Sequence, residues 1–355
     1  MNVGEPPDVK RPAGDARRDR GVLFGWGAGF AFLATLGLFC WLVLAPFVVT
    51  RSVLRRAKSD GVSASHWYYL SDDALGATIK RFGGKDRAVV RLGSYLRLPG
   101  WLASDRDCAA LLLGHLGEPG VPALIKALGD SDAEVRQAAA DALRRVGPPA
   151  RAAAPALVKA LDDPDPRVRK GAAWALGEVG RQEANKPLFD CAFAPKQDVE
   201  AATCAIFSMG KLRYAEKPVI DKYRWMIPQK PVPGFEGQPT PMRLACVRAL
   251  GMVKDEGSLD ILSGRLNDMV GMFPEAPDLR RECAVAMGRI GSKRAVGILR
   301  QHMGQGEEMD DIRVASQWAL WQITGEKPEL KLPPKVHPAP DYFVRYLKPR
   351  PKEKE

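Results

Sequence analysis

The sequence predicts an all-α protein, a right-handed α-solenoid of about seven helix-pair repeats preceded by a single transmembrane helix. Three observations lead to this fold class. The segment EVRQAAADALRRVG (Glu134–Gly147) returns 33 positions later as RVRKGAAWALGEVG (Arg167–Gly180). Glycine and proline recur at matching places in the repeats, and residues 21–50 contain no charged side chain. A repeat of this length means that each unit buries its apolar face against its neighbours.

The repeated unit is a pair of helices, and its second helix carries the stronger pattern. An apolar residue followed by Arg, then small residues, Leu and a closing small residue, recurs seven times. These second-helix segments are Arg106–Gly117, Arg136–Gly147, Arg169–Gly180, Val199–Gly210, Arg243–Lys254, Arg280–Gly291 and Arg313–Thr324. A short apolar helical pattern precedes each of them, as in Val121 to Leu128. Apolar residues at these spacings share one helix face, which we expect to be core.

Glycine and proline mark the predicted helix ends. Gly147, Gly180, Gly210 and Gly291 close second-helix segments, where glycine suits a left-handed C-cap. Pro122, Pro155, Pro187 and Pro218 recur near the starts of the first helices. Proline is tolerated there because the first N–H groups of a helix have no intrahelical partner. Periodicity and caps therefore predict the same helix pairs.

These repeats resemble the HEAT-repeat family, most closely the short subtype named after the phycobilisome (PBS) lyases. The segments that carry the resemblance are GEPGVPALIKALGDSDAEVRQAAADALRRVG and the following unit, which ends ALGEVG. The resemblance covers roughly Ser71 to Gly325, which is the predicted solenoid domain (71–325). It implies a stack of helix pairs that presents a long surface to a partner.

The uncharged run GVLFGWGAGFAFLATLGLFCWLVLAPFVVT (21–50) predicts an uncleaved membrane anchor. A spanning helix needs about 20 apolar residues, and a signal peptide would have a shorter apolar core. The charges that flank the run are nearly equal in number and do not orient it, whereas five cysteines outside it favour the reducing cytoplasmic side. Gly25 and Gly29 form one small-xxx-small pair, which is compatible with a homo-oligomer but does not establish one.

The segments outside the solenoid and the anchor are polar. Residues 1–20 are predicted to be a disordered cationic N-terminus, residues 51–70 a basic juxtamembrane linker, and residues 326–355 a Pro-rich basic tail. The formal net charge is +11, but residues 66–325 are close to neutral because most of the excess lies in these flanks. The basic balance therefore favours contact with a membrane surface or simple solubility over nucleic acid.

Three segments interrupt the regular repeats, at about residues 83–105, 228–241 and 267–278, each expected between the two helices of its unit. Equivalent loops of a solenoid line one edge, and loops on a rigid scaffold often bind. Exposed aromatic and methionine side chains suit adaptable protein contacts, although local packing would also account for them. The candidate partner-binding residues are Trp225, Met226, Phe235, Met269, Met272 and Phe273. Three tryptophans on second helices either form a further stripe that binds a ligand or pack between the helices: Trp174, Trp318 and Trp321.

The motifs of catalysis and of metal binding are not found. His66, His115, His302 and His337 are scattered over unrelated units, and no cysteine forms a CxxC pair. The His-Glu pairs that hold iron in one HEAT-repeat enzyme group, the deoxyhypusine hydroxylases, are not found in this sequence. No P-loop, dinucleotide fingerprint or GxSxG elbow occurs. We therefore expect no cofactor, no metal and no enzymatic activity.

The predicted function is a membrane-anchored scaffold that binds a protein partner non-covalently through its solenoid surface and edge loops. One alternative is a lyase-like or other small-ligand activity in the concave groove. The second alternative is nucleic-acid binding, which is unlikely because carboxylates interrupt the basic surface. The candidate phosphate contacts are Arg144, Arg145, Lys170, Arg248, Arg281 and Arg289, and the interrupting residues are Asp141, Glu178 and Glu282.

Overall fold

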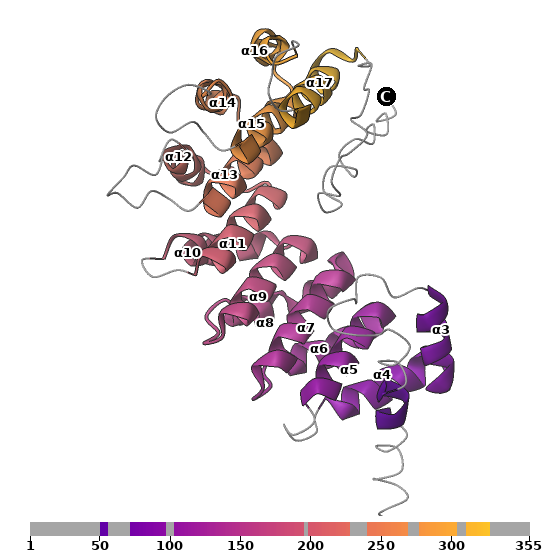
Figure 1. Ribbon diagram of the computed structural model, residues 1–355. Helices are drawn as coiled ribbons and strands as arrows, with labels where there is room; N and C mark the ends of the chain where they lie inside the picture. The colour runs from indigo at the N-terminus through magenta and orange to yellow at the C-terminus, as the bar shows by residue number, and fades with distance from the viewer. Residues whose placement is uncertain are drawn as a thin grey trace, which may run out of the picture.

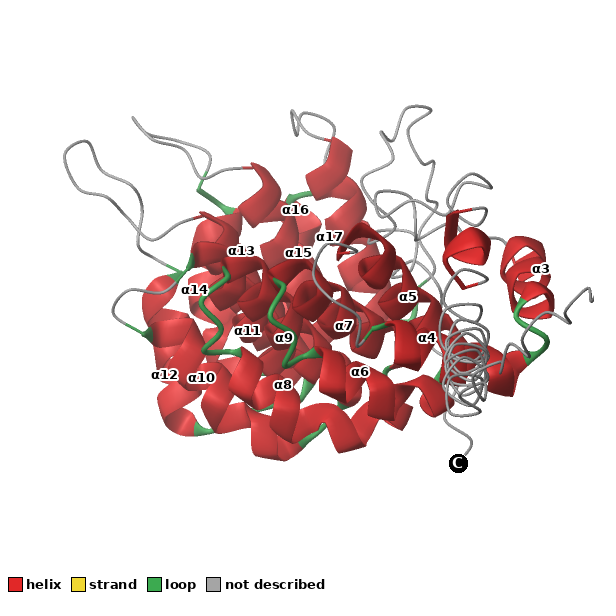
Figure 2. Ribbon diagram, turned by 90° about the horizontal axis from the view of Figure 1, so that it is seen from below, coloured by secondary structure: helices red, strands yellow, loops and turns green. Residues whose placement is uncertain are grey.

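The computed structural model describes residues 50–55, 72–96, 103–194, 198–227, 240–268, 277–303 and 310–326. Within these ranges the chain is a stack of helix pairs and contains no strand, as Figure 2 shows. The first helices of the pairs are α4 (Lys85–Tyr95), α6 (Val121–Ala127), α8 (Ala154–Ala160), α10 (Asn185–Phe193), α12 (Lys217–Met226), α14 (Leu259–Leu266) and α16 (Val296–Gln301). The second helices are α5 (Ala103–Leu116), α7 (Ala133–Val146), α9 (Pro166–Val179), α11 (Val199–Lys211), α13 (Thr240–Val253), α15 (Pro277–Ile290) and α17 (Asp310–Thr324).

The helix pairs form two layers that bend into an arc. Each second helix packs against the second helix of the next unit, from α5 through to α17, and against the first helix of its own unit. The first helices lie on the outer side of the arc and the second helices on its inner side (Figure 1). The seven pairs confirm the predicted helical-repeat solenoid. One further helix, α3 (Asp72–Arg81), precedes the first pair.

Short 3-10 helices lead into five of the first helices. They are η4 (Glu118–Gly120), η5 (Pro148–Ala153), η6 (Gln182–Ala184), η7 (Glu256–Ser258) and η8 (Lys293–Ala295). Pro122, Pro155 and Pro218 occupy the first turn of α6, α8 and α12 respectively. A missing N–H costs little at that place, as the sequence indicated.

A seam of small residues brings successive second helices into close contact. A Cβ added at Gly114 would lie 2.9 Å from the Ala142 backbone, and one added at Gly288 would lie 2.6 Å from the Ala319 backbone. The same close approach occurs at Gly177, Gly210 and Gly251. These distances are too short for any side chain at the glycine, so glycine itself sets the separation of the helices.

The predicted C-cap at Gly210 is wrong. Gly147, Gly180 and Gly291 do have positive φ after their helices, but Gly210 lies inside α11 and packs against Ala249. In this unit Arg213 takes the left-handed conformation instead, with φ 57. The N–H of Tyr214 then donates to the Met209 carbonyl at 3.0 Å, which closes the helix as a Schellman turn does.

The segment 83–105, predicted as an insertion, contains a helix. Lys85–Tyr95 forms α4, which packs against α5 and is the first helix of unit one. Ala88, Leu92 and Tyr95 are its buried residues, at spacings of four and three. That spacing is helical, and Gly83 and Gly84, both with positive φ, separate α4 from α3.

The predicted transmembrane helix, and with it the single-pass membrane location, is corrected here. No helix in the described part of the chain is both long and apolar enough to cross a membrane. The longest of these helices, α17, has 15 residues, whereas a span needs about 20. Of the predicted span 21–50 only Thr50 lies within the described residues, where residues 50–55 are helical and Leu54 is buried.

Candidate partner-binding surface

Aspartates cap the second helices of units two to four and hold the connection between the two helices of each unit. Asp132, Asp165 and Asp198 each accept a hydrogen bond from the backbone N–H two residues later, at 2.8 to 2.9 Å. A hydrogen bond from Arg167 is the main cause that lowers the pKa of Asp165, to about 2. A capping carboxylate of this kind stabilises the start of a helix by about 1 kcal/mol.

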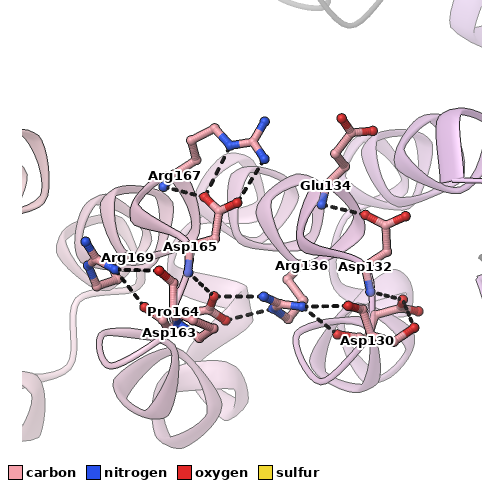
Figure 3. A network of polar contacts seen from close by, with 10 residues as sticks. Asp130, Asp132, Glu134, Arg136, Asp163, Pro164, Asp165, Arg167 and Arg169 are labelled. Atoms are coloured by element: carbon pink, nitrogen blue, oxygen red, sulfur yellow. Dashed lines mark hydrogen bonds and ion pairs between the residues drawn. The ribbon is translucent and has the colours of Figure 1, made fainter.

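An arginine four residues after the cap ties unit two to unit three, as Figure 3 shows, and a second arginine ties unit three to unit four. Arg136 on α7 donates through Nε and Nη2 to both carboxylate oxygens of Asp163, at 2.7 and 2.9 Å, and through Nη1 to the carbonyl of Asp130. Arg169 on α9 repeats the contacts, with the Asp163 carbonyl at 2.8 Å and the Asp198 carboxylate at 3.5 Å. We call this series the Arg–Asp ladder.

The Arg–Asp ladder is structural. Burial on its own would raise the pKa of Asp163, but hydrogen bonds from Arg136 and from the N–H of Asp165 outweigh it, so the pKa is lowered. The first rung joins Arg106, whose side chain is 2% exposed, to Asp130 at 2.7 Å. These charges are turned toward one another and position the connections between units.

The inner side of the second helices forms one continuous surface along the repeats. Each second helix is covered by its own first helix and by the neighbouring second helices, so its exposed side faces into the arc. We number each second helix backwards from the positive-φ residue at its end. The residues two, six and ten positions before that residue lie on the inner side together, because they are spaced by four. We call them the inner stripe. In α7, α9 and α11 they are Gln137, Asp141, Arg145, Lys170, Trp174, Glu178, Thr203, Phe207 and Lys211.

Two aromatic side chains occupy the middle of the inner stripe. Trp174 on α9 and Phe207 on α11 stand at the same position of adjacent, packed helices, and both are partly exposed. Of the tryptophans proposed from the sequence as an aromatic stripe, Trp174 and Trp321 are partly exposed, whereas Trp318 is buried in the core. The sequence did not point to Phe207, which emerges only when the repeats are aligned at their ends.

Ion pairs lie on both sides of this aromatic centre and cross from α9 to α11. The Lys170 ammonium lies 2.7 Å from the Glu200 carboxylate, and Lys211 pairs with Glu178. A hydrogen bond from Lys170 to Glu200 is the main cause that raises the pKa of Lys170. The centre is thus apolar with a charged border, which is the usual arrangement of a protein-binding surface.

Arg144 stands where other second helices have the seam glycine. It lies three residues before Gly147, as Gly114, Gly177, Gly210, Gly251 and Gly288 lie three before the ends of their helices. Its guanidinium carbon lies 4.6 Å from the centre of the Trp174 ring, and its Nε lies 3.8 Å from Asp141. The seam is interrupted at this one place among these helices, and a cation stacked on an aromatic ring replaces it. Comparing the repeats position by position would have found this exception.

The thiols near this surface are not poised for nucleophilic chemistry. Burial raises the pKa of both Cys204 and Cys191 to about 11. Both therefore stay protonated at neutral pH, and the thiolate is the reactive form. In the described ranges no group of three or more His, Cys, Asp or Glu side chains is placed to hold a metal ion.

Of the residues predicted for partner binding, Trp225 and Met226 are described, and they differ in exposure although they are adjacent on α12. Trp225 is 50% exposed on the outer layer, and the Lys222 ammonium lies 4.6 Å from its ring centre and 5.6 Å from that of Phe193. Met226 is 1% exposed and packs in the core, with its sulfur 3.7 Å from the Cys246 sulfur. Phe235, Met269, Met272 and Phe273 lie outside the described residues.

The candidate phosphate contacts on the inner side are largely paired with carboxylates. Lys170 pairs with Glu200, and Arg144 lies near Asp141. Arg248 on α13 lies 2.8 Å from Glu282 on α15, and Arg281 contacts Asp278 and Asp311. The charges therefore alternate across successive helices, which does not favour a polyanion such as nucleic acid.

A cleft of about 530 Å³ lies in the outer layer between α4 and α6. Its walls include Val89, Gly93, Pro122 and Lys126, and the connection at Asp130 borders it. This volume falls within the usual range for small-ligand pockets, about 300 to 1,000 Å³. It lies in the outer layer, whereas the small-ligand alternative was placed in the concave groove.

Family models match much of this stack. Residues 103–154 and 121–208 match the model of HEAT repeats, and residues 279–305 match the PBS lyase HEAT-like repeat. These stretches are HEAT repeats. The HEAT-repeat model ends in α11, so it covers the units that carry the Arg–Asp ladder, and the second match begins in α15. The resemblance inferred from the two strongest units is confirmed.

Three solved structures similar to this stack have 17 to 22% sequence identity with it. Human deoxyhypusine hydroxylase in complex with glycerol matches at 21% identity and a TM-score of 0.33, over 68% of this chain and 98% of that one. The complex of CpcE and CpcF of phycocyanin lyase from Nostoc sp. PCC7120 matches at 22% and 0.41, over 66% and 88%. The E. coli protein YibA matches at 17% and 0.48, over 78% and 96%. No curated protein sequence matches the chain significantly.

Proposed function

We propose that this HEAT-repeat solenoid is a scaffold that holds a protein partner on its inner side, across units two to four. The observation that carries the proposal is the aromatic centre of Trp174 and Phe207 with an ion pair on each side. Binding energy in protein interfaces concentrates in a few aromatic and arginine residues surrounded by polar contacts. The proposed work is non-covalent, and no bond has to be made or broken.

The rigidity of the stack supports this role. Gly177 on α9 brings α11 to a separation that no side chain would permit, and Gly171 on α9 packs closely against Ala140 on α7, so the inner stripe is held in a fixed arrangement. A surface that is ordered before the partner arrives loses less conformational entropy on binding. An extended or helical segment of the partner would run across α7, α9 and α11.

The test is affinity capture with the full chain after brief chemical crosslinking in cell extract. Wild type is compared with a variant that carries Trp174→Leu and Phe207→Leu. Trp225→Leu is the matched control, because it removes an exposed tryptophan from the outer layer. We expect the double variant to lose partners that wild type and Trp225→Leu both keep. Retention of every partner by the double variant would contradict the proposal.

The same capture experiment also tests the predicted role of the edge loops, with one further variant. Residues 228–239 and 269–276 are replaced by Gly/Ser linkers of equal length. We expect this variant to keep the partners of the inner side and to bind them more weakly, because the loops would add contacts at one edge. If the loop variant loses all partners while the double variant keeps them, recognition belongs to the edge instead.

A further inference from the structure

The cleft of the outer layer, between α4 and α6, has apolar walls and a lysine. Its lining includes Val89, Val90 and Gly93 on α4 and Ala123 and Lys126 on α6. We propose that this cleft binds an aromatic side chain of a partner polypeptide, with the Lys126 ammonium over the ring. The cleft lies in the other layer from the inner stripe, so this site does not depend on the stripe.

Small residues leave the cleft open. The two helices touch where Gly93 meets Ala123, since a Cβ added at Gly93 would lie 3.2 Å from the Ala123 Cβ. Neither residue has a side chain long enough to fill the space beside this contact. Val90 is 67% exposed, more than any other large apolar residue in the described ranges. The cleft is therefore apolar and open to solvent along Val90.

Between units four and five, aromatic side chains stand at the equivalent place. We align α4 with α10 by their buried residues, which have the same spacing of four. The helix α10 then has phenylalanine where α4 has Val89 and Gly93. The aligned pairs are Ala88 with Leu188, Val89 with Phe189, Leu92 with Ala192 and Gly93 with Phe193.

The facing helix has a lysine at the same place in both units. A proline in the first turn of α6 and of α12 is followed four residues later by Lys126 and Lys222 respectively. The Phe193 ring reaches α12, where its centre lies 6.5 Å from that of Tyr223. The Lys222 ammonium lies 5.6 Å from the Phe193 centre and 4.6 Å from that of Trp225. Units four and five thus provide the ring and the lysine from one chain, whereas units one and two provide the lysine alone.

Lys126 is free to contact a ring in the cleft. It is exposed and makes no ion pair with a carboxylate of the described ranges. Asp130, the carboxylate that borders the cleft, accepts hydrogen bonds from Arg106 at 2.7 Å and from the N–H of Asp132 at 2.9 Å. An ammonium attracts the face of an aromatic ring, and more strongly where the pair is shielded from water.

The open side of the cleft favours a polypeptide over a free small ligand. Small-ligand sites cover most of the surface of the ligand, whereas this cleft is open along Val90. A segment that lies along α4 would place one ring between the helices and cover Val90 with its neighbouring residues. An aromatic side chain held in a pocket is a common anchor of protein interfaces.

The experiment measures binding of three probes to the full chain by fluorescence anisotropy and competition. Two are short Gly/Ala peptides whose central residue is Phe or cyclohexylalanine, and the third is 3-phenylpropionamide, a ring without the peptide. We expect the Phe peptide to bind about two- to fivefold more tightly than the cyclohexylalanine peptide, which has a similar shape but no π face. Lys126→Ala should remove this preference. Val90→Asp should weaken both peptides at least about tenfold, because the covered valine is lost.

Lys159→Ala on α8 is the matched control, because Lys159 is exposed and follows the proline of its helix by the same four residues. It should change no affinity. Equal binding of the two peptides to wild type, or loss of the preference in Lys159→Ala as well, would overturn the inference. Tighter binding of 3-phenylpropionamide than of the Phe peptide would assign the cleft to a free ligand and would also overturn it.

Two further variants exclude other places of binding. Trp174→Leu with Phe207→Leu should leave the binding of both peptides unchanged, and a loss would mean that they bind the inner stripe. Trp101→Ala, outside the described residues, should also have no effect. A gain in affinity for the Phe peptide in Trp101→Ala would mean that this chain's own tryptophan competes for the cleft, which would contradict a partner as its occupant.

Discussion

Units one to three and units five and six have an arginine at the same place in the repeat, but this arginine makes different contacts in the two groups. In the first group Arg136 reaches forward to a carboxylate of the next unit, Asp163. In the second group Arg243 on α13 donates at 2.8 Å to the carbonyl of Ile227, in its own unit, and Arg280 on α15 donates at 2.9 Å to that of Leu266. The connections GDSD and DDPD of units two and three supply the aspartates of the ladder.

This difference shows that the repeats can keep one fold while the polar contacts between successive units change. The Arg–Asp ladder ends in unit four, where Ala202 follows the Asp198 cap by four residues. The link from unit five to unit six passes instead through the outer layer, where Arg224 on α12 pairs with Asp255 at 2.7 Å. The glycine seam occurs in both groups and is interrupted at Arg144, so the main difference between the groups lies in their polar contacts.

The largest expected effect comes from breaking the seam where the two groups meet. Gly210→Ala would place a Cβ 2.7 Å from the Ala249 backbone, so α11 and α13 must move apart. We expect the free energy of unfolding to fall by about 3 kcal/mol, the upper end of the usual cost of overpacking, because the clash is with backbone atoms. Chemical denaturation measures it.

Gly264→Ala on α14 is the matched control, because an added Cβ there meets no atom within 4 Å. Alanine favours a helix over glycine, so this variant should be unchanged or more stable by up to about 1 kcal/mol. Equal stabilities of the two variants would mean that the seam does not set the helix separation.

Breaking the Arg–Asp ladder should cost nearly as much. Arg136→Ala leaves the Asp163 carboxylate, whose side chain is 8% exposed, without its bidentate partner. We expect a loss of about 2 to 3 kcal/mol, somewhat below the cost of breaking a fully buried pair. Arg167→Ala, at an exposed arginine near the same connection, should change stability little. A cost for Arg136→Ala no greater than that of Arg167→Ala would show that the ladder contributes nothing to stability.

Acid should loosen the ladder before the units beyond it. Asp163 and Asp165 have lowered pKa values, that of Asp165 about 2. Their contribution is present above the ordinary carboxyl pKa and is lost as the pH falls from about 4 toward 2. Asp141 acts in the opposite sense, since its raised pKa favours the protonated form in the fold. Brief pepsin digestion at decreasing pH should cut α7 to α9 first. First cuts in α13 to α16 would contradict this order.

The smallest expected effect concerns the end of α11. Arg213 holds a left-handed conformation that costs a non-glycine residue about 1 to 2 kcal/mol. Arg213→Gly should therefore raise the midpoint of thermal unfolding slightly, while Gly180→Ala, at the same place in unit three, should lower it. A lower midpoint for Arg213→Gly would mean that the arginine side chain stabilises this turn.

The sequence predicted the repeats well because their apolar spacing and their glycines are local signals. Where such a local signal is missing, the predicted helix end was placed at the wrong residue. Unit four ends with Arg213 and not with glycine, so the pattern settled three residues early on Gly210, which belongs to the seam. The helix α4 was missed because residues 83–105 were assigned as an insertion between two helices, although Ala88, Leu92 and Tyr95 have helical spacing.

The candidate site was less predictable. Trp174 could be named from its place on a second helix, but Phe207 and Arg144 become informative only when the ends of the helices are aligned. Trp225 and Met226 are adjacent in sequence, and only the structure shows that Trp225 is exposed whereas Met226 is buried in the core. The predicted anchor rested on the uncharged run of residues 21–50. Among the described helices, none is long and apolar enough to cross a membrane.

The central claim is that the inner side of units two to four holds the partner, and site-specific photo-crosslinking tests it most directly. A benzoylphenylalanine is placed at Phe207 on the inner stripe or at Trp225 on the outer layer of the full chain, and each protein is irradiated in cell extract. The account predicts a discrete crosslinked protein from position 207 that Trp174→Leu abolishes, and no such product from position 225. The same product from position 225, with none from position 207, would contradict it.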